Sequence, residues 1–437
     1  DTGSGVDHYE SDGNGDGIAD FALSSPWSPG NGFSSCTQRF RAVDKAGNVG
    51  PWSEGQHIHM DIEAPSKTSV NLNGYTSGTT VNATVKITPS ATDNVGIAKY
   101  QYSHNNSSWV DWPTGTSAWD ISWNGSWNFY IRAVDHAGNV GASSDVFTLK
   151  IDKPFKVDSP SVNATSLADA VSQANAGTTI QLLKNFTDTS SGTISKNLTL
   201  NFGANTLTRS SGIDVGAATV TFNGSTGGVT NTAASYTIWA LVAGSRVTFN
   251  SGVYKNTSNY PVFCNFGQSK ITGGTFNSSD ANTIQNGNTD SNTGLLWISG
   301  GTFTAAGTNA SAVIRNFSDQ RWPTSENSSY IHYCTHYCSV HITSAVNITA
   351  TGTKYGVLNK TTGGTGRIHF PSAYSGTVSS ANNYAIRAAN GAVEANGGTY
   401  KAKNSSYFKS GSGATFGSQA YCWPSGATGA SLCSQYG

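Results

Sequence analysis

Short runs in which apolar and polar residues alternate recur along the whole chain. Between Asn128 and Val134, for example, Phe129, Ile131 and Ala133 alternate with other residues. Alternation with a period of two predicts β-strands that bury one face. The many Gly, Thr and Asn residues between these runs disfavour long helices. The sequence therefore predicts an all-β protein.

The first third of the chain contains an internal repeat with an offset of 91 residues. The segment RAVDKAGNVG at 41–50 returns as RAVDHAGNVG at 132–141, and Tyr9 maps onto Tyr100. A match kept over separate stretches without a gap indicates duplicated units. Within each copy, Asp-x-Ala-Gly-Asn predicts a turn, because Gly readily takes positive φ and Asn tolerates it. We interpret Asp44 and Asp135 as turn formers.

These residues resemble the bacterial immunoglobulin-like surface modules that end in RAVDxAGN. The resemblance covers about residues 1–152 and implies tandem Ig-like β-sandwiches at 1–62 and 63–153, which serve as spacers in cell-surface display. The first copy has no counterpart of Ala64 to Ser90 in the second. We therefore expect an N-terminally incomplete first module, and a chain that begins inside a domain of a longer protein.

A different periodicity follows residue 153. Thr-Phe-Asn or Thr-Phe-Thr recurs in steps of 27, with its phenylalanines at Phe222, Phe249, Phe276 and Phe303. A second series of short apolar triplets begins at Tyr236, Tyr260, Ser311, Tyr355 and Tyr384. Two interleaved strand series with this spacing predict a parallel β-helix, whose stacked coils place equivalent side chains above one another. The four phenylalanines are predicted to form one column.

One short helix is predicted before these coils. Ser166 is placed to cap it, Asp169 follows three residues later, and Gly177 is placed to end it. Such a helix would cover the open end of a β-helix. Residues 166–183, followed by 197–202, resemble the first coils of pectate-lyase-like β-helix domains of secreted bacterial proteins. The resemblance implies a right-handed parallel β-helix with an N-terminal capping helix over 154–437, and it implies no particular activity.

Charge and composition narrow the range of partners. The chain has 25 basic and 25 acidic residues, so its net charge is zero, and charged residues make up 11%, against roughly 25% in an average soluble domain. A nucleic-acid binder needs a basic face, and a bilayer-spanning helix needs about 20 apolar residues. The sequence therefore predicts no nucleic-acid partner and no membrane insertion.

The pairing of the six cysteines gives information about the cellular location of the protein. Cys422 and Cys433 enclose a short loop and are predicted to form a disulfide. The pairing of the other four stays open at this point, namely Cys36, Cys264, Cys334 and Cys338. Partial use of disulfides favours an extracellular or bacterial cell-surface location.

One loop near the N-terminus resembles part of a calcium site. Asp12, Asn14, Asp16 and Asp20 occupy positions 1, 3, 5 and 9 of a calcium loop, with Gly at position 6. The bidentate Glu expected at position 12 is replaced by Leu23. The alternative is a polar, glycine-rich hairpin loop. No other cofactor is predicted.

The segment from Phe317 to His341 interrupts the coil repeat. Its aromatic and polar side chains suit a sugar or a protein partner, and we predict a binding site made of Arg321, Trp322, Tyr330, His332, Tyr333, His336 and Tyr337. The alternative is a loop packed on itself. His332, Cys334, His336 and Cys338 alternate, as zinc ligands could, but neighbours two apart on a strand are about 6.5 to 7 Å apart and cannot surround one ion. Disulfides and surface histidines are favoured instead.

Catalytic residues are harder to find. Glycoside hydrolysis needs two facing carboxylates, and polysaccharide lyase chemistry needs a base with a cation or an arginine. The candidates are Asp280 with Asp290, or Asp319 with Glu326 and Arg321. No tight acidic cluster is visible, and whether either set meets in space is not predicted.

The sequence favours a non-enzymatic, adhesin-like protein that binds a host glycan or a host protein through its β-helix. Its few carboxylates and its surface of Thr, Ser and Asn support this interpretation. Two alternatives stand beside it: a polysaccharide lyase or glycoside hydrolase on the same scaffold, and a structural stalk without a ligand. The identity of the ligand and the oligomeric state are not predicted.

Overall fold

The computed structural model of the 437-residue chain contains two compact units, residues 1–152 and residues 153–437. It describes residues 3–23, 35–59, 61–288, 293–308, 311–321, 338–352, 355–361, 363–403, 408–424 and 431–433. The described residues are almost entirely β-structure, with one short α-helix. No helix among them has the length and apolar character needed to cross a membrane.

The first unit begins with a four-stranded antiparallel sheet in the order β2-β1-β3-β4. Its strands are β1 (Val6–Asp12), β2 (Phe21–Leu23), β3 (Ser35–Asp44) and β4 (Gln56–His59). The described residues 3–59 form this one sheet, in keeping with a first copy shorter than the second.

The second repeat forms two sheets around one core. Their strands are β5 (Ser69–Asn71), β6 (Thr80–Val81), β7 (Val85–Ser90), β8 (Ile97–Ser103), β9 (Val110–Asp111), β10 (Trp119–Ile121), β11 (Gly125–Asp135) and β12 (Phe147–Ile151). The sheet orders are β10-β7-β5 and β6-β12-β11-β8-β9. Ile87 and Ile121 from the first sheet pack with Phe129, Ile131 and Leu149 from the second, so alternating residues on both sheets bury one face each.

The duplicated turn has the same structure in both copies. The carboxylate of Asp44 accepts hydrogen bonds from the backbone and side-chain amides of Asn48, each at 2.8 Å. Asp135 binds Asn139 in the same way, at 2.8 and 2.9 Å. The glycine before each asparagine has positive φ, as the turn requires. The interpretation of both aspartates as turn formers is consistent with these contacts.

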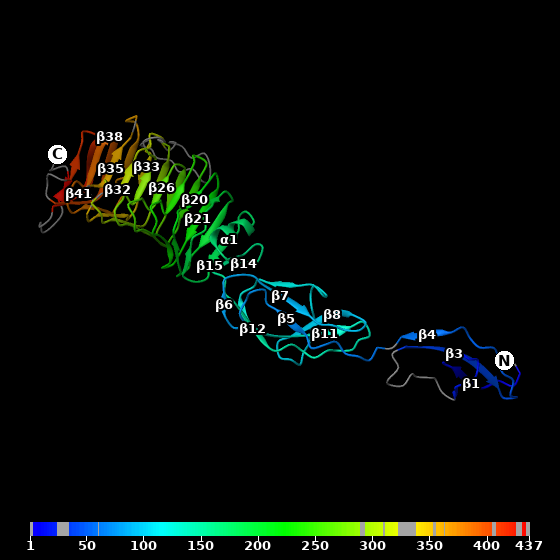
Figure 1. Cartoon of the computed structure of the whole chain (residues 1–437). Helices are drawn as coiled ribbons and strands as arrows, with labels where there is room; N and C mark the ends of the chain where they lie inside the picture. The colour runs from blue at the N-terminus through cyan, green and yellow to red at the C-terminus, as the bar shows by residue number, and fades with distance from the viewer. Residues whose placement is uncertain are drawn as a thin grey trace. The chain divides into compact units, whose positions relative to one another are not determined.

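The second unit is a β-solenoid in which strands of successive coils pair side by side (Figure 1). A nine-stranded parallel sheet forms one side of the coil. Its strands are β17 (Thr193–Ile194), β20 (Ile213–Val215), β23 (Ile238–Ala240), β26 (Phe263–Asn265), β29 (Ile284–Asn286), β32 (Ala312–Asn316), β35 (Tyr355–Lys360), β38 (Ile386–Asn390) and β40 (Lys409–Ser410). The predicted apolar triplets that begin at Tyr236, Tyr260, Ser311, Tyr355 and Tyr384 lie on these strands or just before them.

The remaining strands of the solenoid form a continuous 21-stranded sheet that wraps around its other sides. They are β13 (Phe155–Val157), β14 (Val162–Ala164), β15 (Thr179–Leu182), β16 (Phe186–Asp188), β18 (Leu198–Asn201), β19 (Thr206–Arg209), β21 (Thr219–Asn223), β22 (Gly228–Asn231), β24 (Arg246–Phe249), β25 (Val253–Asn256), β27 (Gln268–Ile271), β28 (Thr275–Ser278), β30 (Leu295–Ile298), β31 (Thr302–Ala305), β33 (Val340–Ile342), β34 (Asn347–Ala350), β36 (Arg367–Phe370), β37 (Thr377–Ser380), β39 (Ala392–Ala402), β41 (Ala414–Pro424) and β42 (Ser431–Leu432). From β15 to β41 the strands pair in parallel between coils.

The four repeated phenylalanines form two columns, not the single column predicted. Phe222 stacks on Phe249 at a centroid distance of 5.1 Å, and Phe276 stacks on Phe303 at 5.0 Å. Phe249 and Phe276 instead meet edge to face, at 85°. The reason is coil length: Phe249 pairs with Ile271 in the next coil, so a step of 27 residues overshoots the column and reaches the next strand.

Helix α1 (Leu167–Gln173) lies at the N-terminal end of the coil stack (Figure 1). The side chain of Ser166 accepts a hydrogen bond from the Asp169 amide, as predicted, and Leu167 and Ala170 are buried. The helix ends at Gln173, earlier than the predicted stop at Gly177. Its apolar face closes the end of the coil, where a core would otherwise meet water.

Buried asparagines connect successive coils inside the nine-stranded sheet. Asn265 donates to Asn286 at 2.7 Å, Asn286 donates to Asn316 at 2.8 Å, and Asn316 donates to Asn359 at 2.9 Å. All four residues have no exposed surface. Each side chain thus satisfies the polar group of its neighbour, as a buried amide requires.

Candidate functional site

The outward-facing residues of the nine-stranded sheet form a column along the solenoid. Asp214 on β20 pairs with Trp239 on β23, which pairs with Cys264 on β26, followed by Gln285 and Arg315. The residues on either side of Asp214 and Trp239 point inward and are buried. Strand alternation therefore presents a polar and aromatic column on this face.

A hollow of about 320 Å³ lies at the N-terminal end of this column. We call it the aromatic hollow; it is lined by Ser191, Gly192, Ser211, Gly212, Asp214, Ala234, Ser235, Tyr236, Trp239 and Tyr260. The Tyr236 ring lies 5.1 Å from Trp239 and 5.6 Å from Tyr260, at 51° and 85° between planes. Tyr260 is 36% exposed. Three aromatic rings in different orientations therefore stand around one opening.

The electrostatics of the aromatic hollow centre on Asp214. Burial raises the pKa of its carboxyl, and the positive charge of Arg209 opposes this effect. Burial also raises the pKa of Tyr236, which contacts Cys264, and raises the pKa of Cys264 to about 12. At neutral pH, Tyr236 and Cys264 are therefore neutral, and they offer hydrogen-bonding groups without charge.

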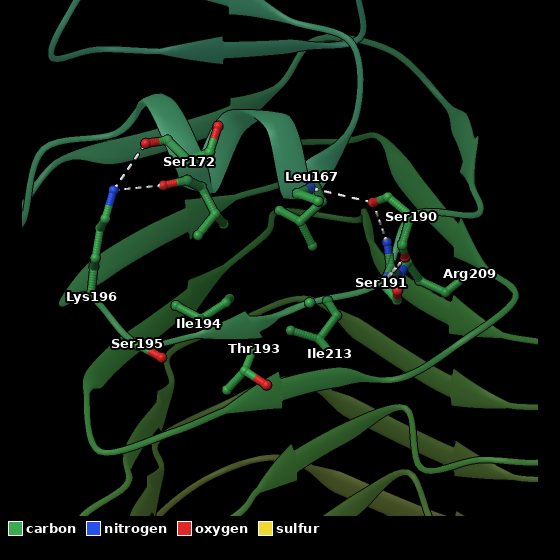
Figure 2. A pocket seen from close by; sticks show the side chains of 13 residues that line it. Leu167, Ser172, Ser190, Ser191, Thr193, Ile194, Ser195, Lys196, Arg209 and Ile213 are labelled. Carbon is green, nitrogen blue, oxygen red and sulfur yellow. Dashed lines mark hydrogen bonds between the residues drawn. The ribbon is translucent and has the colours of Figure 1, made fainter.

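A second hollow, of about 260 Å³, lies beside it under helix α1 (Figure 2). We call it the helix hollow; it is lined by Leu167, Ala168, Val171, Ser172, Ser190, Ser191, Gly192, Thr193, Ile194, Ser195, Lys196, Arg209 and Ile213. Ile194 and Ile213 face the helix from the coil (Figure 2). Ser191 and Gly192 line both hollows, so the two spaces adjoin.

Two cationic side chains hold the helix over its hollow. Lys196 donates to the carbonyl oxygens of Val171, Ser172 and Ala174 at 2.9 to 3.0 Å. Figure 2 shows the first two of these bonds. A cation at a helix C-terminus complements the helix dipole. At the other end, Arg209 and Asp188 form an ion pair at 2.6 Å, with both side chains 2% exposed. Asp188 also accepts from the Leu167 amide at 2.9 Å, so this pair ties the helix to the first coils.

The predicted binding segment lies largely outside the described residues. The predicted site residues outside the described part are Trp322, Glu326, Tyr330, His332, Tyr333, Cys334, His336, Tyr337 and Asp290. Of the predicted binding residues, Arg321 is described, and it donates to the Thr365 carbonyl at 2.8 Å. Asp280 follows β28 and is half-buried. The pairs of Asp280 with Asp290, and of Asp319 with Glu326, therefore stay predictions.

Asp319 binds the backbone of a neighbouring loop. Its carboxylate accepts hydrogen bonds from the amides of Gly363 at 2.5 Å, Thr365 at 2.9 Å and Gly366 at 3.2 Å. Burial alone would raise its pKa, but these amides outweigh burial and lower the pKa to about 2. A carboxylate this acidic is a weak base, so the contacts favour a structural role over a catalytic one.

We expect replacement of Asp319 by Asn to lower the free energy of unfolding by about 1 to 2 kcal/mol at pH 7, since a partly exposed group is screened by solvent. Because the folded-state pKa lies below the ordinary 3.8, this contribution is complete above about pH 4 and is lost as the pH falls towards 2. Urea unfolding of both proteins at several pH values measures the difference. If the difference in unfolding free energy between the two proteins does not decrease below pH 4, the structural role assigned to Asp319 is contradicted.

The other described carboxylates of the solenoid also have polar partners. Asp158 accepts from Gln181 at 2.8 Å, Asp169 accepts from the Thr165 amide at 2.8 Å, and Glu394 pairs with Arg367. Asp214 is set apart from these carboxylates by its position, because it lines the aromatic hollow. The described residues that line this hollow include no second carboxylate.

The loop proposed for calcium is held by its own backbone amides. Asp12, which is fully buried, accepts from Gly15 at 2.6 Å and Gly17 at 3.0 Å. Asp20 accepts from Gly13 at 2.7 Å, and Asn14 donates to Asp16 at 3.1 Å. These bonds are what a polar hairpin loop requires, and calcium binding by these four residues stays a prediction.

In the described part of the chain, two other groups of side chains have the composition of metal ligands. Asp61, Asp93 and Asp135 bring one carboxylate oxygen each within 4.8 Å of one another. Side-chain amides bind two members of this group, since Asn94 donates to Asp61 and Asn139 donates to Asp135. The second carboxylate oxygen of Asp61 is buried and has no hydrogen-bond partner among the described residues. Cys338, His341 and His369 form the second group within the same distance.

The cysteines divide into bridged and unbridged residues. Cys422 and Cys433 form the predicted disulfide, with a Cα–Cα distance of 5.0 Å. Cys338 is also disulfide-bonded, whereas Cys36 and Cys264 are free thiols. Cys334 lies outside the described residues.

Comparison with known proteins gives little further information. No protein-family model matches the chain, and no curated protein sequence matches it. Fibronectin(III)-like modules of Clostridium thermocellum CbhA align at 16% identity over 35% of this chain and 81% of theirs, with a TM-score of 0.23. The Yersinia enterocolitica family 28 exopolygalacturonase aligns at 11% identity over 82% of this chain and 99% of its own, with a TM-score of 0.18. Scores this low support no conclusion about function.

Proposed function

We propose that this chain is an extracellular or cell-surface protein of adhesin type, which binds a host carbohydrate in the aromatic hollow. The observation that carries the proposal is the grouping of Tyr236, Trp239 and Tyr260 around a hollow that also contains Asp214. In this proposal the N-terminal repeats act as Ig-like spacers, and calcium in the loop from Asp12 to Asp20 would stiffen the first of them.

The chemistry of the hollow suits a sugar ring. A pyranose has a face of C–H groups that packs on flat aromatic rings, and hydroxyl groups at its edge that need hydrogen-bonding partners. The rings of Trp239 and Tyr260 offer the first kind of contact. The Asp214 carboxyl and the hydroxyls of Ser211 and Ser235 offer the second. A host protein remains the alternative partner, because exposed aromatic side chains also serve protein interfaces.

The adjoining helix hollow extends the same site. It is bounded by the apolar side chains of Leu167, Ile194 and Ile213 and shares Ser191 and Gly192 with the aromatic hollow. An apolar substituent on a bound sugar, such as an acyl group, would bury its surface there, and burial of apolar surface is favourable.

A carbohydrate-active enzyme is the second candidate function. The raised pKa of Asp214 is what a proton donor to a glycosidic oxygen requires. Glycoside hydrolysis also needs a second carboxylate about 5 to 9.5 Å away, and Asp214 is the only carboxylate among the described residues that line the aromatic hollow. Binding without turnover is therefore the better supported function.

We expect replacement of Trp239 by Ala to weaken glycan binding by at least about tenfold, since a buried aromatic anchor contributes 1.4 kcal/mol or more. A glycan array probed with the full chain identifies the ligand, and calorimetry then measures its affinity for each variant. The matched control is Trp123→Ala, which removes an exposed tryptophan from the first unit.

Three outcomes decide between the proposals. Loss of binding in Trp239→Ala and Tyr260→Ala, with Trp123→Ala unchanged, supports the aromatic hollow. Unchanged binding in both hollow variants would remove this hollow as the site. Release of shorter saccharides by the wild-type chain, lost in Asp214→Asn, would favour the enzyme.

A further inference from the structure

A pair of stacked histidines lies on the outward face of the 21-stranded sheet, away from both hollows. His341 on β33 and His369 on β36 occupy paired positions of adjacent coils. Their rings are 5.1 Å apart at 22°, and their Nδ1 atoms are 3.1 Å apart. His369 is 2% exposed, whereas His341 is half-buried.

The short distance between the two Nδ1 atoms limits how protons are shared. Two N–H groups cannot point at each other across 3.1 Å, so this contact holds one proton between two lone pairs. Asn396 lies on the other edge of His369, with its Nδ2 atom 3.3 Å from Nε2. The two Nδ1 atoms are therefore close enough to share one proton, and an amide contacts the other edge of the His369 ring.

A sulfur atom completes this arrangement. The Sγ of Cys338 and one nitrogen of each histidine all lie within 4.8 Å of one another. Cys338 has no exposed surface, and its sulfur is engaged in a disulfide in this structure. As a disulfide, the sulfur cannot act as a thiolate ligand.

We propose that His341 and His369 bind a zinc ion through their Nδ1 atoms, and that Cys338 becomes a third ligand when its disulfide is reduced. Two nitrogens bound at 2.0 to 2.1 Å to a tetrahedral ion are about 3.3 Å apart, and the observed 3.1 Å needs little adjustment. Zinc replaces the shared proton. Water would supply the coordination positions that the protein ligands leave vacant.

The residue beside His369 suits a metal-bound state. A metal-ligating histidine donates its other N–H to an oxygen acceptor, which fixes the ring. If His369 binds zinc through Nδ1, its proton moves to Nε2, and Asn396 needs only to turn its amide so that Oδ1 accepts it. Both amide orientations fit the same position, so Asn396 is a positioning residue for either state.

The redox step balances with a dithiol as reductant. The dithiol transfers two electrons and two protons to the disulfide of Cys338, so the S–S bond breaks, two thiols form, and the dithiol closes into its own disulfide. The Cys338 thiol then loses its proton to water as the thiolate binds zinc. Oxidation therefore weakens the site and reduction strengthens it.

Zinc binding by the whole 437-residue chain tests this proposal directly. The oxidised protein is titrated against a chromophoric zinc chelator, and the same protein is titrated after treatment with dithiothreitol and its removal by gel filtration. We expect binding in both states, with affinity increased at least tenfold on reduction. Cobalt provides a second readout, because a thiolate-to-cobalt charge-transfer band should appear in the reduced protein alone.

Variants assign the ligands. His341→Ala should abolish zinc binding in the oxidised state, and Asn396→Ala should weaken it about 10- to 100-fold. Cys338→Ser should bind zinc like the oxidised wild type and should not respond to dithiothreitol, which separates this site from reduction of the Cys422–Cys433 bond. Thermal melts show that each variant is folded. The zinc site is overturned if the wild type does not bind zinc, or if zinc binding survives both His341→Ala and His369→Gln. The role of Cys338 is overturned if reduction leaves the zinc affinity unchanged.

Discussion

Replacing Asn286 by alanine is expected to lower the free energy of unfolding of the solenoid by about 3 kcal/mol or more, because each buried polar group left without a partner costs about 1 to 3 kcal/mol. Asn286 accepts a hydrogen bond from Asn265 at 2.7 Å and donates to Asn316 at 2.8 Å and to the Gly294 carbonyl at 2.9 Å. The alanine side chain can make none of these bonds. The loss falls in the middle of the asparagine chain, so both neighbouring coils are affected.

Chemical denaturation of the wild type and of two variants measures this effect. Asn277→Ala serves as the control, because Asn277 faces outward on β28 between the buried residues Phe276 and Ser278. An outward substitution of this kind is expected to stay within about 0.5 kcal/mol of the wild type. Equal stability of the two variants would show that the buried amides do not connect the coils energetically.

The β-solenoid could be predicted because its signals are local. Alternation with a period of two identifies strands, and recurrence of Phe and Tyr at similar spacings identifies stacked coils. The exact columns could not be predicted, because coil length varies. Phe249 pairs with Ile271, whereas Thr275 pairs with Thr302, so a constant step of 27 residues joins side chains from two different columns.

The candidate site was missed for the same reason. Asp214, Trp239 and Tyr260 lie on or beside three successive strands of the nine-stranded sheet, and only the register between coils brings them around one hollow. A signal was present, since Tyr236 and Tyr260 stand at the same phase of the second predicted series. Within that series they were interpreted as strand markers. An aromatic residue at the edge of a coil strand has room to face outward, which the period-two pattern alone does not reveal.

The histidine pair shows how stacking changes the chemistry of a repeat. Alternate residues on one strand are about 6.5 to 7 Å apart, but laterally paired residues of adjacent coils are about 4.8 Å apart. His341 and His369 are such a lateral pair, and their nitrogens meet although their positions in the sequence are distant. Ligand sets in a solenoid are therefore found across coils rather than along a strand.

Replacing Arg209 by methionine is expected to destabilise the solenoid by about 3 to 5 kcal/mol, since it leaves the Asp188 carboxylate buried without its cation. Both side chains are 2% exposed and their nearest atoms are 2.6 Å apart. Asp188 also holds the amide of Leu167 at the start of α1, so the capping helix should loosen first. Hydrogen exchange of residues 166–173 should report this before global unfolding.

The double variant Asp188→Asn with Arg209→Met separates the charge effect from the loss of packing. Asparagine keeps an acceptor for the Leu167 amide but carries no charge, so the double variant should be more stable than Arg209→Met alone. If the two substitutions simply add, the ion pair contributes no coupling energy, and the helix is held by its apolar face. Because Arg209 lines the helix hollow, the same pair of variants also measures how far ligand affinity depends on a firmly closed end of the coil.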